Sequence, residues 1–188
     1  MKILINPGHG GNDCGAVGNG LIERDVALFI GNRVETYLQA VGYDARVFQY
    51  DGLKAICNEA NNWHADLFVS IHCNAFNGKA SGTETIYYEH STAGKKLANC
   101  IQRQIVSSLG TVDRGIKPKI SGDYDAYVTK YTDMPAVLVE TAFIDNPNDA
   151  KLLVDREDDF ARAIARGVTD YFAQLRPAPD VIDKPCRR

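Results

Sequence analysis

Three side chains that can do chemistry stand at or just beyond the ends of short apolar segments. They are His9, His72 and Glu140, which come after the apolar runs at residues 3–5, 67–71 and 136–139. Runs of this length are typical of buried strands, and sites in open α/β sheets form at the carboxyl ends of the strands. A lone histidine or glutamate at such a place is more often structural, but the shared placement of three predicts one catalytic or metal-binding site.

Glycines surround the first histidine in the segment NPGHGG. They let the backbone turn sharply beneath the imidazole of His9 and leave space beside it for a metal ion and a water. A dinucleotide-binding turn is the alternative, but a GxGxxG fingerprint that starts at Gly8 needs a third glycine where Asp13 stands. The segment therefore favours a metal ligand at His9.

A carboxylate is needed to complete such a site, because hydrolytic zinc usually has three protein ligands and one open position. Glu23, in the segment GLIERD, is the best candidate, since a loop anchored at His9 can fold back and present it to the same ion. The alternative is that Glu23 only stabilises the positive end of the helix that it begins. The spacing alone leaves both interpretations open.

Strands and amphipathic helices alternate along the chain, which predicts an α/β fold. Apolar residues three and four positions apart predict helices over residues 26–41, 53–63, 97–109 and 160–175. The predicted strands cover residues 3–5, 45–50, 67–71, 83–88 and 136–139. Because each parallel crossover needs a helix to return the chain, we expect a mostly parallel sheet with helices on both faces.

Two further segments carry local signals. The polar stretch at residues 111–134 is expected to be a long loop with a role in binding; it contains Arg114, Tyr124, Tyr127 and Tyr131. Asn146 followed by Pro147 predicts the start of another helix, because asparagine caps helices and proline fits their first turn.

The composition predicts one soluble globular domain, since 45% of the 188 residues are hydrophobic and 24% are charged. We place it at residues 1–175, with a flexible tail or linker stub at 176–188, where three of the seven prolines lie. A net charge of -3 argues against nucleic acid as a partner. The first apolar run is too short for a signal peptide or a membrane span, so synthesis in the cytoplasm without membrane insertion is expected. Five cysteines without CxxC spacing predict no disulfide framework.

Several motifs, in this order, resemble those of the zinc-dependent N-acetylmuramoyl-L-alanine amidases of autolysins, sporulation lysins and phage endolysins. They are NPGHGG, LIERD, SIHCNA, DRGIK and MPAVLVETAFIDN, within residues 2–175. The resemblance implies a twisted sheet of about six strands between helices. It also implies one zinc ion (Zn2+) held by His9, Glu23 and His72, with Glu140 as the catalytic carboxylate.

The function implied by this resemblance is hydrolysis of the amide bond between N-acetylmuramic acid and L-alanine in peptidoglycan, which lyses the cell wall. Asn74 and Arg114, within the matching motifs, are the candidate substrate-binding residues. Action at the wall after release, without a signal peptide, favours an endolysin or sporulation lysin over a secreted autolysin. The alternatives are a zinc carboxypeptidase-like enzyme that acts on wall peptides and a catalytically silent peptidoglycan-binding module.

The chain also departs from the family pattern. Asn6 stands where the family usually has aspartate, so any orienting bond to His9 is expected to come from the amide oxygen of Asn6. Cys14 replaces a common proline and stays a candidate metal ligand. Cys73 is not expected to be one, because its side chain points away from that of its strand neighbour His72. The remaining histidines, at positions 64 and 90, are predicted to lie on the surface.

Overall fold

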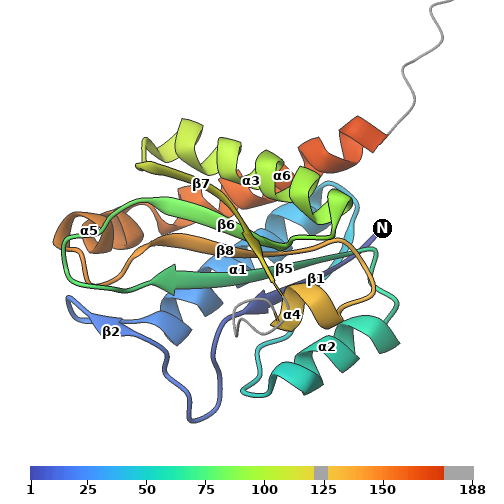
Figure 1. Ribbon diagram of the computed structural model, residues 1–188, viewed down its shortest axis with the longest axis horizontal. Helices are drawn as coiled ribbons and strands as arrows, with labels where there is room; N and C mark the ends of the chain where they lie inside the picture. Colours follow the sequence, from blue (N-terminus) through green and yellow to red (C-terminus); the bar gives the residue numbers. More distant parts are fainter. Residues whose placement is uncertain (121–126, 176–188) are drawn as a thin grey trace, which may run out of the picture.

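The computed structural model describes residues 1–120 and 127–175, and a six-stranded sheet forms its centre (Figure 1). Its strands, in spatial order, are β4 (Asp44–Val47), β1 (Lys2–Pro7), β5 (Leu67–Asn74), β8 (Ala136–Phe143), β6 (Thr83–Tyr88) and β7 (Asp113–Lys119). The first four are parallel, β6 runs antiparallel to β8, and β7 runs parallel to β6. The predicted sheet of about six mostly parallel strands is confirmed.

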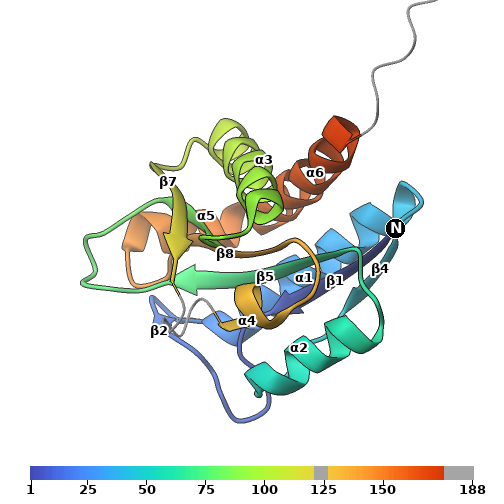
Figure 2. The same ribbon diagram turned by 45° about the vertical axis from the view of Figure 1, so that its right-hand side comes forward.

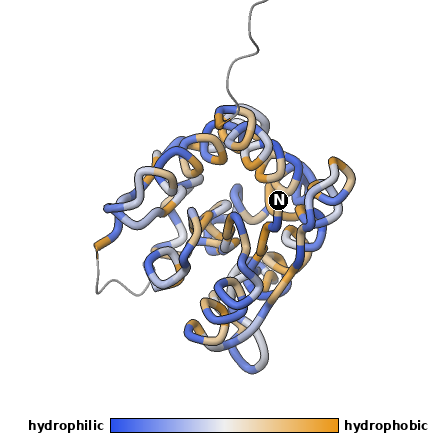
Figure 3. Tube along the Cα trace, turned by 90° about the vertical axis from the view of Figure 1, so that its right-hand side faces the viewer, coloured by the Kyte–Doolittle hydropathy of each residue, from blue (hydrophilic) through white to orange (hydrophobic). Residues whose placement is uncertain are grey.

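Helices cover both faces of this sheet, so the fold has three layers (Figure 2). One face is covered by α1 (Glu23–Ala40), α3 (Thr92–Leu109) and α6 (Glu157–Leu175). The other carries α2 (Leu53–Asn62) and the short α4 (Tyr127–Tyr131). Hydrophobic and hydrophilic residues alternate along the helical turns (Figure 3), as expected for helices that bury one side. None of the helices in the described ranges is both long and apolar enough to cross a bilayer.

Strand β5 shows how the sequence divides its side chains between the two faces. Leu67, Val69, Ile71 and Cys73 belong to the core under α1, α3 and α6, whereas Phe68 packs in the core under α2. Successive side chains of a strand point to opposite faces. His72 therefore shares a face with Phe68 and lies on the α2 side of the sheet.

The segment at residues 111–134 differs from the prediction of a continuous loop. It contains the edge strand β7 and the helix α4. Gly115 and Pro118 are residues that strands usually lack, so the sequence pattern did not predict β7. Proline is tolerated there because β7 pairs only with β6. Tyr124 lies outside the described residues.

Other local elements are close to expectation. Asn146 caps α5 (Pro147–Asp155) as predicted, because its side chain accepts hydrogen bonds from the N–H groups of Asn148 and Asp149. A small hairpin, β2 (Val17–Gly18) with β3 (Leu21–Ile22), was not predicted. Its turn, Asn19–Gly20, has positive φ at both residues, which is the requirement of a type I′ turn. The predicted tail at 176–188 lies outside the described residues.

Candidate metal and catalytic site

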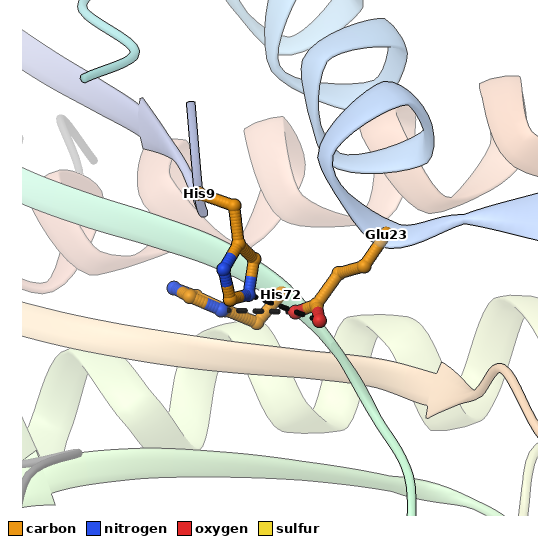
Figure 4. A group of neighbouring side chains, drawn as sticks. All are labelled: His9, Glu23 and His72. Atoms are coloured by element: carbon orange, nitrogen blue, oxygen red, sulfur yellow. Dashed lines mark hydrogen bonds and ion pairs between the residues drawn. The ribbon is translucent and has the colours of Figure 1, made fainter. Parts of the chain in front are cut away.

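Two histidines and one glutamate meet at the carboxyl ends of β1 and β5 (Figure 4). The Nε2 atom of His9 lies 3.0 Å from Oε2 of Glu23, and Nδ1 of His72 lies 3.0 Å from Oε1 of the same carboxylate. One ligand atom from each residue lies within 4.8 Å of the other two. Two imidazoles and a carboxylate are the donors that hydrolytic zinc sites use, so these residues fit a metal ion.

Glycines make this approach of the two rings sterically feasible. A Cβ atom on Gly8 would lie 2.3 Å from Cε1 of His72, so any larger residue there would displace the ring. His9, two residues beyond the end of β1, has a φ of 61°, and its imidazole lies beside the carboxylate of Glu23. Gly8 thus leaves room for the second histidine, whereas the predicted space for a metal ion and a water stays a prediction.

Glu23 is the buried centre of the cluster, with 4% of its surface exposed. Its Oε2 atom accepts a hydrogen bond of 2.8 Å from the N–H of Ala16, and Oε1 accepts one of 3.0 Å from the N–H of Cys73. Burial alone would raise the pKa of this carboxyl, but hydrogen bonds from His72 and His9 outweigh burial and hold its pKa well below the usual range. Glu23 is thus an anion fixed between two imidazoles, and stabilisation of the helix end does not account for that position.

His9 is oriented by a second carboxylate, which the sequence analysis missed. Nδ1 of His9 lies 2.8 Å from Oδ2 of Asp13, which comes four residues later in the same loop. The hydrogen bond to Glu23 raises the pKa of His9 to about 9, against the effect of burial and with a further contribution from Asp13. The prediction that the amide oxygen of Asn6 orients His9 is wrong. The amide oxygen of Asn6 accepts from the hydroxyl of Ser70 at 2.9 Å.

A cavity of about 300 Å³ opens over the cluster on the α2 side of the sheet. Glu140 lines it together with His9, Glu23 and His72. Glu140 is the register partner of His72 on the neighbouring strand β8, so its side chain lies on the same face. The structure therefore places a carboxylate beside the cluster and in the same cavity.

The two candidate substrate-binding residues are joined by a glutamate that the sequence analysis did not single out. The side-chain amide of Asn74 donates to Oε1 of Glu84 at 2.9 Å, and Nε of Arg114 donates to Oε2 of Glu84 at 2.9 Å. Asn74 lines the cavity, whereas Arg114 is exposed on β7 and does not. No motif signal marked Glu84, because it occupies an ordinary polar position of an alternating strand.

The thiols of Cys14 and Cys73 stand apart from the candidate metal-ligand cluster. Cys14 is exposed and its thiol donates to the carbonyl of Gly15 at 3.4 Å. Cys73 is buried on the opposite face from His72, and burial raises the pKa of its thiol. Within residues 1–120 and 127–175, the one cluster that can hold a metal is His9, Glu23 and His72. His64 and His90 are exposed, as predicted.

The sequence and the fold also resemble those of known proteins. Residues 3–170 match the sequence pattern of the N-acetylmuramoyl-L-alanine amidase family. The chain belongs to this family. The predicted fold, membership and enzyme class are thereby confirmed for the amidase.

Individual relatives show how much of the amidase is shared. It is 41% identical over 179 residues to the N-acetylmuramoyl-L-alanine amidase LytC of Bacillus subtilis. This alignment covers 90% of this chain but 35% of LytC. It is also 41% identical to the uncharacterized protein YqiI of Bacillus subtilis, with 92% of this chain and 85% of YqiI covered. The crystal structure of an N-acetylmuramoyl-L-alanine amidase from Clostridium difficile superimposes with a TM-score of 0.81 at 34% identity, covering 92% of this chain and 96% of that one. The chain thus spans about a third of LytC and most of the other two.

Proposed function

We propose that this chain is a zinc-dependent amidase that hydrolyses the bond between N-acetylmuramic acid and L-alanine in peptidoglycan. The observation that carries the proposal is the cluster of His9, Glu23 and His72 in a cavity that Glu140 also lines. The family match supports the choice of substrate. Peptidoglycan as substrate places the action of the enzyme at the cell wall.

His9, Glu23 and His72 would hold one zinc ion. When bound, zinc supplies a Lewis acid and lowers the pKa of an adjacent water from about 15.7 to about 7. One ligand carboxylate against the two charges of the ion leaves the site electrophilic toward a carbonyl oxygen. The backbone N–H groups of Ala16 and Cys73 hold the Glu23 carboxylate through hydrogen bonds of 2.8 and 3.0 Å.

Glu140 acts as general base and then as general acid. It takes a proton from the attacking water, whose oxygen bonds to the amide carbon of the substrate. When the carbon–nitrogen bond breaks, Glu140 delivers that proton to the departing amine, and the products are a lactyl carboxylate on the sugar and a peptide with a free alanine amino group. The position of Glu140 next to His72, across one strand spacing, supports this role.

Asn74 and Arg114 bind the peptide part of the substrate. Asn74 lines the cavity that would hold the substrate. Arg114 does not line the cavity, which favours binding of a substrate carboxylate over stabilisation of the oxyanion. Glu84 accepts hydrogen bonds from both side chains and so keeps Arg114 close to Asn74.

Metal analysis combined with digestion of purified peptidoglycan tests the proposal. The wild-type protein should contain one zinc ion per chain, lose activity in chelator and regain it on zinc addition. Glu140→Gln should keep the zinc but lose activity by about 10²–10⁴-fold, the usual contribution of a general acid–base group. His9→Ala should lose both zinc and activity.

Product analysis separates the alternatives. New amino termini of alanine are expected from the amidase. Release of single carboxyl-terminal amino acids would instead identify a carboxypeptidase-like enzyme, and retention on peptidoglycan without any cleavage would identify a binding module. Full activity in chelator, or an active Glu140→Gln protein, would overturn the proposed mechanism.

A further inference from the structure

The side chains around the cavity follow the order of the strands. Tyr50 comes after the edge strand β4, His9 follows β1, His72 lies on β5, and Glu140 lies on β8. Glu84 and Arg114 begin β6 and β7, which run the other way, so they lie at the same edge of the sheet. A substrate that lies across this edge meets Tyr50 at one end and Arg114 at the other, with the cluster between them.

Tyr50 is unusual among the exposed aromatic residues. Its side chain is 53% exposed and it lines the cavity, whereas the other exposed aromatic side chains of the described residues, Phe29, Phe76 and Tyr131, do not. Its ring stacks on Phe48 with 5.9 Å between centroids and 22° between planes. An exposed aromatic ring in a cavity wall, packed against a second ring, is typical of a ligand contact.

The backbone of Tyr50 is also tied to the loop that carries His9. A Cβ atom on Gly10 would lie 3.0 Å from the carbonyl carbon of Tyr50, so the two segments pass each other in close contact. The side chain of Gln49 donates to the carbonyl of Gly8 at 3.2 Å and strengthens this connection. The position of the Tyr50 ring relative to the cluster is therefore set by the same loop that presents His9.

Charge distinguishes the two ends of the cavity. Asp13 and Asp51 line the cavity beside Tyr50, and both are exposed. Two carboxylates disfavour an acidic peptide at this end, whereas an uncharged sugar is not repelled and can donate hydroxyl hydrogen bonds to them. At the other end Asn74 lines the cavity, and Arg114 lies beyond it on β7, with Glu84 accepting hydrogen bonds from both side chains. The arrangement suits a neutral ring on the Tyr50 side and a peptide on the Arg114 side.

We infer that Tyr50 is a substrate-binding residue that stacks against the pyranose ring of the N-acetylmuramoyl unit, so that the peptide runs across Glu140 toward Arg114. The inference rests on the proposed function, because it names how that substrate lies in the cavity. The ring of Tyr50 contributes the contact through its face, so its hydroxyl is not needed.

Two soluble substrates test this orientation. One is a muramoyl-peptide, and the other is a lactoyl-peptide, which keeps the same scissile amide but lacks the sugar ring. Tyr50→Ala should raise KM for the muramoyl-peptide by roughly fivefold to tenfold, about the value of one aromatic contact, and leave kcat unchanged. Its KM for the lactoyl-peptide should equal that of the wild type. Tyr50→Phe should retain wild-type kinetics on both substrates.

Phe76→Ala is the matched control, because Phe76 is 78% exposed but does not line the cavity, and it should leave both substrates unaffected. Equal losses of Tyr50→Ala on both substrates, or no loss on either, would overturn the inference while wild-type hydrolysis still supports the proposed function. Absence of wild-type hydrolysis would instead remove the proposed function, and the inference with it.

Discussion

Substitution of Gly15 by alanine tests whether the backbone between His9 and Glu23 is shaped to bring these residues together. Gly15 has a φ of 66°, and a Cβ atom on it would lie 2.5 Å from Cδ2 of His9 and 2.6 Å from Oε2 of Glu23. Cβ atoms in real structures essentially never approach other heavy atoms closer than 3.0 Å. Gly15→Ala must therefore push the imidazole and the carboxylate out of their present positions.

Gly110 provides the matched control. It has a φ of 67° at the end of α3, and a Cβ atom there would meet no atom within 4 Å. Both substitutions place alanine in the left-handed region, which costs about 1–2 kcal/mol of stability. Only Gly15→Ala also moves two ligands. Loss of ligand orientation typically reduces metal affinity by about 10–100-fold, which corresponds to about 1.4–2.8 kcal/mol.

Two measurements on each variant separate these effects. Denaturant unfolding in chelator gives the stability of the metal-free protein, and both variants should lose stability. Zinc titration against a competing chelator gives the affinity, which should fall for Gly15→Ala and stay at the wild-type value for Gly110→Ala. If Gly15→Ala bound zinc as tightly as Gly110→Ala, the proposed ligand set or the need for its present geometry would be refuted.

Two further predictions follow from the charges of the site. Because Glu23 and Asp13 raise the pKa of His9 to about 9, the metal-free protein carries a proton on His9 at neutral pH that zinc must displace. Zinc affinity should therefore rise about tenfold per pH unit between about pH 6 and 8, and a pH-independent affinity in chelator competition would contradict this. Asn6→Asp should destabilise the protein by about 2–4 kcal/mol at pH 7 in denaturant unfolding, because a buried carboxylate would replace the amide that donates to the carbonyls of Pro7 and Phe48. Burial would raise the pKa of the new carboxyl, so the loss of stability should shrink as the pH falls. Asn146→Asp should be tolerated, because this residue caps a helix, where an anion is favoured. Equal losses of stability in the two variants would refute the argument.

The parts of the fold that the sequence predicts well are those with a dense apolar pattern. Strand β5 was recognised from the continuous run at residues 67–71, because a strand covered on both faces buries every side chain. The same argument located β8, although its last residues, from Glu140 to Phe143, were not included. The candidate ligand set was predicted from the strand ends together with the family motifs, and the structure brings its three members together.

Elements with little apolar content were missed for a physical reason. β7 is an edge strand with partly exposed residues, so its sequence carries no hydrophobic alternation. The partners that complete the site were missed as well. Asp13 and Glu84 act through hydrogen bonds across loops and strands, and such contacts depend on distances that spacing along the chain does not define. The close approach of Gly15 to His9 and Glu23 was not predicted, because it depends on a φ angle and on the positions of these two side chains.

The register of β5 connects the fold to the chemistry. Oε1 of Glu23 contacts Nδ1 of His72 and accepts a hydrogen bond from the backbone N–H of Cys73, and these are adjacent residues of one strand. A shift of β5 by one residue would turn Cys73 toward the cavity and His72 into the core under α1, α3 and α6. That shift would bury an imidazole among apolar side chains and exchange the residues that pack in the two cores, so the packing of both cores disfavours it. The same burial that selects the fold therefore also selects which side chain of β5 reaches Glu23.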